Sequence, residues 1–139
     1  QASVSAVRVL GDPRTLTRLV RNLVDNALRH AHREIRLECR PVDGYAQIMV
    51  ADDGPGIPAS ERFRVFDRFV RLDSPRSRVS GGAGLGLSIV DEIVHEHRGT
   101  VRVDESQSGG ARFVVLLPLV VDQTVADAAD GFDAVPGER

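Results

Sequence analysis

Apolar residues recur every three to four positions from Pro13 to about Ala31, which predicts a long amphipathic helix. Asp12 is a suitable N-cap for it, and Pro13 suits its first turn. The same spacing returns at about 84–97 and predicts a second long helix. A short helix is expected around 59–66. The pattern therefore predicts three helices.

Alternating apolar and polar residues predict five short strands. These strands are expected at residues 5–10, 34–40, 45–51, 100–104 and 111–117. Turns at 41–44 and 108–110 join the second strand to the third and the fourth to the fifth. Strands that come in adjacent pairs, without strict alternation with helices, predict a two-layer α/β sandwich with a mixed, largely antiparallel sheet.

Composition limits what this fold can contain. The 139 residues are the size of one domain, and 42% are hydrophobic but only 4% aromatic, so Val, Leu, Ile and Ala must build the core. No apolar run approaches the roughly 18–20 residues that a membrane span needs. The single cysteine, Cys39, excludes an internal disulfide and a multi-cysteine zinc site.

Charge excludes further classes of function. The net charge of −2 argues against a nucleic-acid-binding domain that relies on a strong positive field. All 18 basic residues are arginine, which excludes lysine-dependent phosphate loops and Schiff-base chemistry. Residues 119–139 hold five acidic residues against Arg139. We therefore expect a folded domain at 1–118 and an acidic, disordered tail at 119–139.

The first motif that suggests chemistry lies on the long helix. Asn22 and Asn26 are one turn apart on one face, and Arg29 and His30 follow one turn later. An amide oxygen of Asn26 suits a hard cation such as Mg²⁺, and Arg29 suits phosphate. Taken alone, the motif is a weak signal, because a solvated polar face is the commoner explanation for an asparagine in a helix.

The second motif, residues 52–57, reads Asp-Asp-Gly-Pro-Gly-Ile and directly follows a strand. Its glycines permit tight turning and the close approach of a planar ligand to the backbone. A carboxylate at the strand end, here Asp52, can accept a hydrogen bond from an exocyclic amine such as adenine N6. An ordinary turn is the alternative.

The third motif is the glycine-rich stretch 81–87, which opens the last helix. Free N–H groups at a helix start favour phosphate. A loop precedes it rather than a strand, unlike in a dinucleotide site, and it lacks the lysine of a phosphate loop. The loop at 70–83 is long enough to be functional or mobile.

The fourth motif is Phe66-Asp67-Arg68-Phe69, followed by Arg71. Its aromatic residues could simply pack in the core. Its arginines are also placed beside the long loop, where they could stabilise a transferring phosphate.

Together, the first to fourth motifs resemble the N, G1, G2 and F boxes of the catalytic and ATP-binding domain of bacterial sensor histidine kinases. Along the chain, the F box comes before the G2 box. The wider superfamily, called GHKL, includes DNA gyrase B and Hsp90-type ATPases. The resemblance covers about residues 5–118. It implies the family's Bergerat fold, in which a mixed five-stranded sheet packs against three helices.

The resemblance also implies a function and its cofactors. Such a domain binds Mg²⁺-ATP and supplies the γ-phosphoryl group to a histidine on a separate dimerisation and phosphoacceptor domain, and a response regulator is an indirect partner. Asn26 would coordinate Mg²⁺, and Arg68 would join it as a catalytic residue. Residues 70–83 would form the ATP lid. The other implied nucleotide-binding residues are Asn22, Arg29, His30, Asp52, Gly54, Gly56, Ile57, Arg71, Gly82, Gly84, Leu85, Gly86 and Leu87.

The histidines do not supply the phosphoacceptor. His95 and His97 lie on the last helix, where His97 continues the apolar side, and no dimerisation helix pair surrounds them. We therefore expect the catalytic domain only, monomeric when isolated. It would be the cytoplasmic portion of a membrane-anchored sensor, without direct contact to membrane or nucleic acid.

Three other functions fit the same fold. A serine kinase of the anti-sigma-factor type generally lacks a clear F box, which this chain has at 66–69. A degenerate nucleotide-binding module is disfavoured by the intact Asn26 and Asp52. A free-standing ATPase is disfavoured because Asp25 stands where ATP-hydrolysing relatives carry glutamate.

Overall fold

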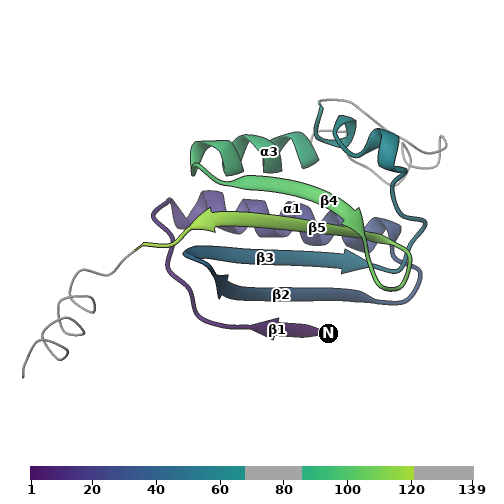
Figure 1. Cartoon of the computed structure of the whole chain (residues 1–139), viewed down its shortest axis with the longest axis horizontal. Helices are drawn as coiled ribbons and strands as arrows, with labels where there is room; N and C mark the ends of the chain where they lie inside the picture. The colour runs from purple at the N-terminus through teal and green to yellow at the C-terminus, as the bar shows by residue number, and fades with distance from the viewer. Residues whose placement is uncertain (68–85, 121–139) are drawn as a thin grey trace, which may run out of the picture.

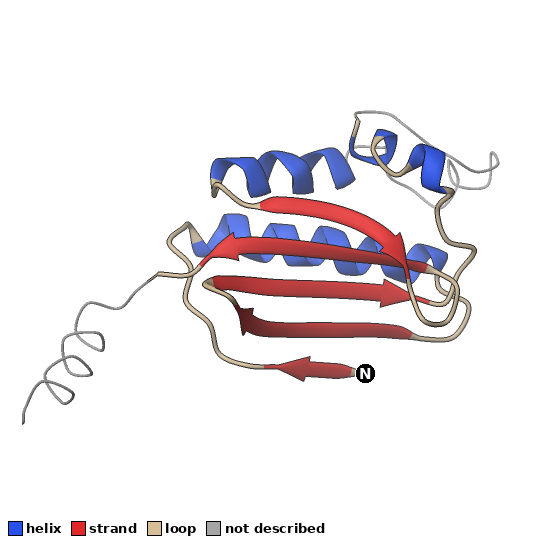
Figure 2. Cartoon of the chain, viewed as in Figure 1, coloured by secondary structure: helices blue, strands red, loops and turns tan. Residues whose placement is uncertain are grey.

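The computed structural model describes residues 1–67 and 86–120 (Figure 1). Its main elements are β1 (Ala2–Val4), α1 (Pro13–His30), β2 (Ile35–Val42), β3 (Tyr45–Asp52), α3 (Gly86–Glu96), β4 (Thr100–Glu105) and β5 (Ala111–Pro118). The strands form one sheet in the order β1-β2-β3-β5-β4. Only β1 and β2 pair in parallel. The predicted two-layer α/β sandwich with a mixed, largely antiparallel sheet is confirmed (Figure 2).

The first strand is not where the alternation predicts it. The strand pairing involves residues 2–4, which lie beside 37–39 of β2, whereas residues 5–10 were expected to form the strand. Val7 and Val9 do alternate toward the core, but as part of the connection that leads from the sheet to α1. Alternation marks the buried side of an extended segment, and it does not show whether another strand lies beside that segment.

Helix α1 begins and ends as expected. The carboxylate of Asp12 accepts a hydrogen bond from the backbone N–H of Arg14, 2.9 Å away, which caps the first turn. The short helix expected at 59–66 is present as two separate 3₁₀ turns, Ala59–Glu61 and Arg64–Phe66. Residues 68–85, which include Arg68 and Phe69 of the F box, lie outside the described residues.

One aliphatic core lies between the sheet and the two helices. Leu19 and Leu23 of α1 and Val90 of α3 pack there against the inward side chains of the strands. In β3 these inward residues alternate as Ala46, Ile48 and Val50, so Asp52 continues onto the same face as the helices. The period of the strand therefore points the Asp52 side chain toward α1.

The F-box phenylalanine at the end of the second 3₁₀ turn is part of this core. Phe66 makes an edge-to-face contact with the fully buried Phe113 of β5, with ring centroids 6.0 Å apart and planes at 89°. Core packing, which the sequence left open for this motif, is thus the role of Phe66.

His95 of α3 and His97, the residue after the end of α3, have structural partners. His97 is half-buried, its Nδ1 lies 2.7 Å from the carbonyl oxygen of Ile93, and a Cβ on Gly11 would lie 2.3 Å from its Nε2. His95 is exposed, and its Nδ1 lies 2.8 Å from the carbonyl oxygen and 3.3 Å from Oδ1 of Asp91. His97 therefore packs against Gly11, just before α1.

Backbone pairing continues just beyond the expected domain end at residue 118. The N–H of Leu119 donates to the carbonyl of Gly44, and that of Val120 donates to the carbonyl of Arg8. The tail predicted from 119 onward lies, from residue 121, outside the described residues. In the described ranges, no helix is both long enough and apolar enough to cross a membrane.

Candidate nucleotide-binding site

Asp52 is a buried carboxylate at the end of β3, with 3% of its surface exposed. Its Oδ1 accepts hydrogen bonds from the backbone N–H groups of Gly54, at 2.8 Å, and Ala111, at 3.3 Å. Within residues 1–67 and 86–120, no group donates to its Oδ2. Buried polar atoms are nearly always hydrogen-bonded, so this oxygen is suited to accept from a ligand donor.

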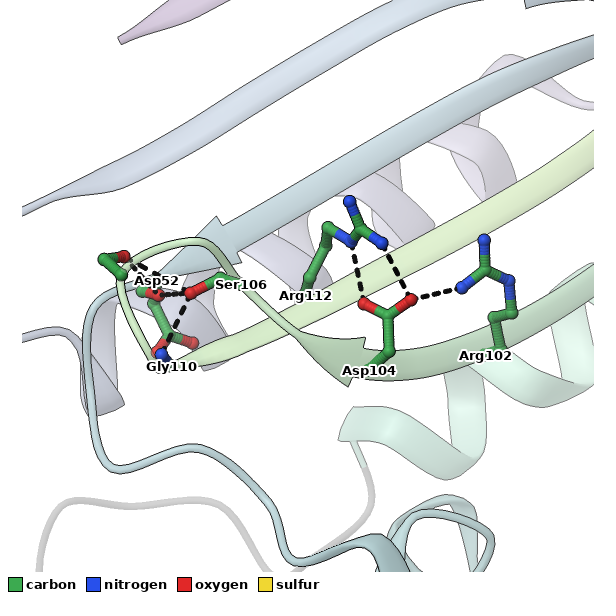
Figure 3. A network of polar contacts seen from close by, with 7 residues as sticks. Asp52, Arg102, Asp104, Ser106, Gly110 and Arg112 are labelled. Atoms are coloured by element: carbon green, nitrogen blue, oxygen red, sulfur yellow. Dashed lines mark hydrogen bonds and ion pairs between the residues drawn. The ribbon is translucent and has the colours of Figure 1, made fainter.

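The turn between β4 and β5 contacts the backbone of Asp52 (Figure 3). The Ser106 hydroxyl donates to the Asp52 carbonyl at 2.8 Å and accepts from the Gly110 N–H at 2.9 Å. A Cβ on Gly110 would lie 2.2 Å from the same carbonyl oxygen, so only glycine fits. The turn was predicted from the sequence, but its contact with Asp52 was not. The Ser-Gly-Gly at 108–110 was the only signal for it.

The neighbouring carboxylate, Asp53, has a different role. Its two oxygens accept hydrogen bonds from the backbone N–H groups of His32 and Arg33 at 2.8 to 3.1 Å, which ties the G1 loop to the chain just after α1. The Arg33 N–H is the largest of the effects that lower the pKa of the Asp53 carboxyl. Desolvation opposes it, and the N–H groups of Glu34 and His32 add to it.

This hydrogen bonding makes the stability contribution of Asp53 pH-dependent. A carboxyl whose pKa is lowered by folding stabilises the protein above its unfolded pKa, near 3.8, and this contribution is lost as the pH falls through the lower folded value. We expect Asp53→Asn to unfold more easily than the parent at neutral pH, and the difference to shrink as the pH falls below 3.8. Urea unfolding at a series of pH values measures it. A difference that stays constant down to acid pH would contradict the assignment.

The glycines of the G1 loop allow close backbone contacts. A Cβ on Gly54 would lie 2.2 Å from the carbonyl oxygen of His30, so the loop packs directly against the end of α1. Gly56 has φ +77°, and a Cβ there would lie 2.9 Å from the Gly109 carbonyl oxygen. Ile57 packs against the core. The loop thus joins the end of α1 to the β4–β5 turn.

Asn26 is the buried polar residue of α1, with 7% of its surface exposed. No residue in the described part of the chain hydrogen-bonds its side-chain amide. A buried amide left unsatisfied costs about 1–3 kcal/mol, which a ligand can recover. Its oxygen is a suitable ligand for Mg²⁺, and no cluster of three or more His, Cys, Asp or Glu competes as a metal site among the described residues. The solvated polar face that the sequence left open does not apply to Asn26.

Gly86, the first described residue of the glycine-rich motif, contacts α1. The Asn22 amide donates to the Gly86 carbonyl at 3.4 Å, and the Arg29 guanidinium lies 3.9 Å from where a Cβ on Gly86 would be. Leu87 packs against the core instead of facing a ligand with its side chain. Asn22, Arg29 and the start of α3 are therefore brought together.

Five predicted site residues cannot be placed. They lie outside the described residues together with the predicted lid at 70–83. They are Arg68, Arg71, Gly82, Gly84 and Leu85.

A hollow of about 420 Å³ lies on the opposite, helix-free face of the sheet. Buried Met49 and Val114 line it, surrounded by charged side chains such as Arg36, Glu38 and Arg112. Asp52 and Ser106 lie at its edge, but Asn22 and Asn26 do not line it. Because the Asp52 side chain alternates onto the other face, we place the candidate site between α1, the G1 loop and the start of α3.

Comparison with known families identifies this arrangement. The family described as "Histidine kinase-, DNA gyrase B-, and HSP90-like ATPase" matches residues 11–121, most of the chain. The chain belongs to this ATPase family. Asn26, Asp52 and the described glycines all fall within the matched residues.

Several relatives of this ATPase-family chain are sensor histidine kinases. Over 109 residues it is 42% identical to the sensor histidine kinase CpxA of Escherichia coli K12. This match covers 78% of this chain and 24% of CpxA. Among solved structures, the mycobacterial sensor histidine kinase MprB is 35% identical with a TM-score of 0.76, covering 86% of this chain and 80% of that one. Full-length ShkA, solved in complex with AMPPNP, is 28% identical with a TM-score of 0.71, covering 87% and 26%.

These comparisons confirm the resemblance and the fold. The chain spans about a quarter of the length of CpxA. The activity of a whole sensor kinase such as CpxA therefore also involves parts that this chain does not match.

Proposed function

We propose that this chain binds Mg²⁺-ATP and supplies its γ-phosphoryl group to a histidine on a separate dimerisation and phosphoacceptor domain. The observation that carries the proposal is a pair of buried polar side chains, Asn26 and Asp52. Each has a polar group without a hydrogen-bond partner in the described ranges 1–67 and 86–120. Burying such groups is unfavourable in an empty site and favourable once a ligand satisfies them.

The two residues would recognise opposite ends of ATP. Asp52 Oδ2 would accept a hydrogen bond from the adenine amine, with Gly54, Gly56 and Ile57 shaping the base pocket. Asn26 would hold Mg²⁺ at the phosphates. Bound there, Mg²⁺ would neutralise charge on the phosphate oxygens during transfer.

Further residues and backbone groups would bind the phosphates or flank the nucleotide. Arg29 is always charged and lies beside the start of α3, so it suits an anionic ligand. Asn22 holds that helix start, and the backbone there would donate to phosphate. His30 would flank the nucleotide. Arg68 and Arg71, proposed from the sequence alone, would reach the γ-phosphate.

The transfer needs a nucleophile that another domain supplies. A ring nitrogen of the acceptor histidine would attack the γ-phosphorus, a new P–N bond would form, and the bond to the β,γ-bridging oxygen would break to release ADP. A response regulator would then receive the phosphoryl group. Since the relatives are sensor kinases, we place this domain in the cytoplasmic portion of a membrane-anchored sensor.

Calorimetric titration of the 139-residue chain tests the ATP site. ATP and a non-hydrolysable analogue should bind, and removing Mg²⁺ should weaken both by about tenfold or more, because the phosphates then lack their counterion. Adding a phosphoacceptor domain in trans should then yield a phosphorylated histidine, stable to base and labile to acid.

Failure in these two steps would have different meanings. Absence of ATP binding, by the chain and by the full-length protein alike, would favour a degenerate module. ATP binding followed by transfer to serine would favour the anti-sigma-type kinase.

A further inference from the structure

The carbonyl of Asp52 receives an unusual partner at the end of the β3–β5 ladder. Pairing between these strands stops at Ala51 and Arg112, so Asp52 has no partner residue in β5. Its carbonyl oxygen accepts instead from the Ser106 hydroxyl, at 2.8 Å. A side chain thus replaces the next strand hydrogen bond directly at the proposed adenine carboxylate.

Ser106 uses both hydrogen-bonding capacities of its hydroxyl. Besides donating to Asp52, its Oγ accepts from the Gly110 N–H at 2.9 Å, while its own N–H donates to the Gly110 carbonyl at 2.8 Å. It is also one of the three buried polar residues in the described ranges, with 7% of its surface exposed. A buried hydroxyl that donates and accepts at once leaves little rotational freedom to its partners.

The same turn also holds the Asp52 side chain. The residue after Gly110 is Ala111, whose N–H donates to Asp52 Oδ1. By setting the position of Gly110, the Ser106 hydroxyl therefore helps to set the direction of this N–H. With Oδ1 held by Ala111 and Gly54, the free oxygen, Oδ2, has a defined orientation.

The β4–β5 hairpin is braced just before the turn. Asp104 and Arg112 are cross-strand partners joined by two hydrogen bonds, at 2.7 and 2.9 Å, and Arg102 adds a third contact to the Asp104 carboxylate (Figure 3). Figure 3 shows this bidentate pair on β4 and β5, beside the contacts that Ser106 and Gly110 of the turn make with Asp52 at the end of β3. The turn is therefore anchored at its base and can serve as a rigid support.

We propose that Ser106 is a positioning residue that sets the base selectivity of the nucleotide site by orienting the Asp52 carboxylate from the β4–β5 turn. This inference rests on the proposed function, because it needs Asp52 to contact the base. Ser106 itself does not touch the ligand. Its effect should appear in recognition of the base and not in recognition of the phosphates, which the α1 and α3 residues would bind.

The test is calorimetric titration of Ser106→Ala with Mg²⁺-ATP, Mg²⁺-GTP and Mg²⁺-tripolyphosphate. We expect the Kd for ATP to rise by about tenfold, which corresponds to the loss of roughly one well-made hydrogen bond. The ratio of the Kd for GTP to the Kd for ATP should fall by a similar factor. Tripolyphosphate has no base, so its affinity should not change. Ser60→Ala, at an exposed serine in the first 3₁₀ turn, is the control and should match the parent for all three ligands.

A second variant makes allowance for a nearby hydroxyl. The Ser108 Oγ lies 3.5 Å from the Asp52 carbonyl and 3.3 Å from the Ser106 Oγ, so it can move in when Ser106 is shortened. The double variant Ser106→Ala/Ser108→Ala should therefore narrow the selectivity further than Ser106→Ala. If Ser106→Ala does not fold, Ser106→Cys, with a similar size and a weaker donor, should show the same narrowing.

The outcomes separate this inference from the proposed function. If the parent binds ATP no better than tripolyphosphate, the proposed function fails at the base site. If the parent prefers ATP but the Ser106 variants keep the full preference, the positioning role is wrong. If ATP, GTP and tripolyphosphate all weaken equally, Ser106 supports the fold alone, which also overturns the inference.

Discussion

Asn26→Ala is expected to remove the Mg²⁺-dependent part of ATP binding while leaving the fold intact. The amide is buried and unpartnered in the described part of the chain, so alanine deletes no hydrogen bond of the protein. Alanine is also the best helix former, which offsets the lost packing. The contact with the metal is lost, and an interaction with a charged group is worth about 1.5–3 kcal/mol, or roughly 10- to 150-fold in Kd.

Two measurements check this expectation. Titration with ATP, with and without Mg²⁺, should show that the variant binds equally weakly in both conditions. Urea unfolding without nucleotide should give a free energy of unfolding within about 1 kcal/mol of the parent. Thr17→Ala, at an exposed position of the same helix, controls for general effects on α1 and should bind normally. Unchanged affinity of Asn26→Ala in Mg²⁺ would rule out the metal role.

Asp52→Asn is expected to shift base selectivity from ATP toward GTP. The oxygen of the new amide must stay on the Oδ1 side, where the N–H groups of Gly54 and Ala111 need an acceptor. The NH₂ group is then forced into the position of Oδ2. It would oppose the adenine amine, a donor, but match guanine O6, an acceptor. A reversed donor–acceptor pair at a buried site changes discrimination by at least about tenfold.

Asp53→Asn is the matched control for this exchange. It makes the same chemical change one residue away, at a carboxylate whose oxygens face the backbone of His32 and Arg33. Measured by competition between ATP and GTP, its selectivity should equal that of the parent at neutral pH. If both variants alter selectivity alike, the loop as a whole is responsible, and the assignment of Asp52 to the base is wrong.

The elements were largely predictable because the hydrophobic periods are local. Every three to four residues in α1, and every two in β3, an apolar side chain must reach the core, and the structure follows both patterns. The helix cap at Asp12 and the turn at Asp43-Gly44 were predictable for the same reason, because each involves only neighbouring residues. Asp43 and Gly44 both have positive φ, as such a turn requires. Residues 5–10 were wrong as a strand because pairing depends on a distant partner, here residues 37–39 of β2.

The sequence by itself determined the family, the order of its motifs and the types of side chain at the site, because these are properties of residues and their spacing. Only the tertiary structure decided how two adjacent carboxylates divide their roles. Asp52 is buried by the alternation of β3 and held by a turn more than fifty residues away, while Asp53 faces the chain after α1. It also brought Ser106 against Asp52, since the end of the β3–β5 ladder leaves a carbonyl that the Ser106 hydroxyl of the neighbouring hairpin satisfies.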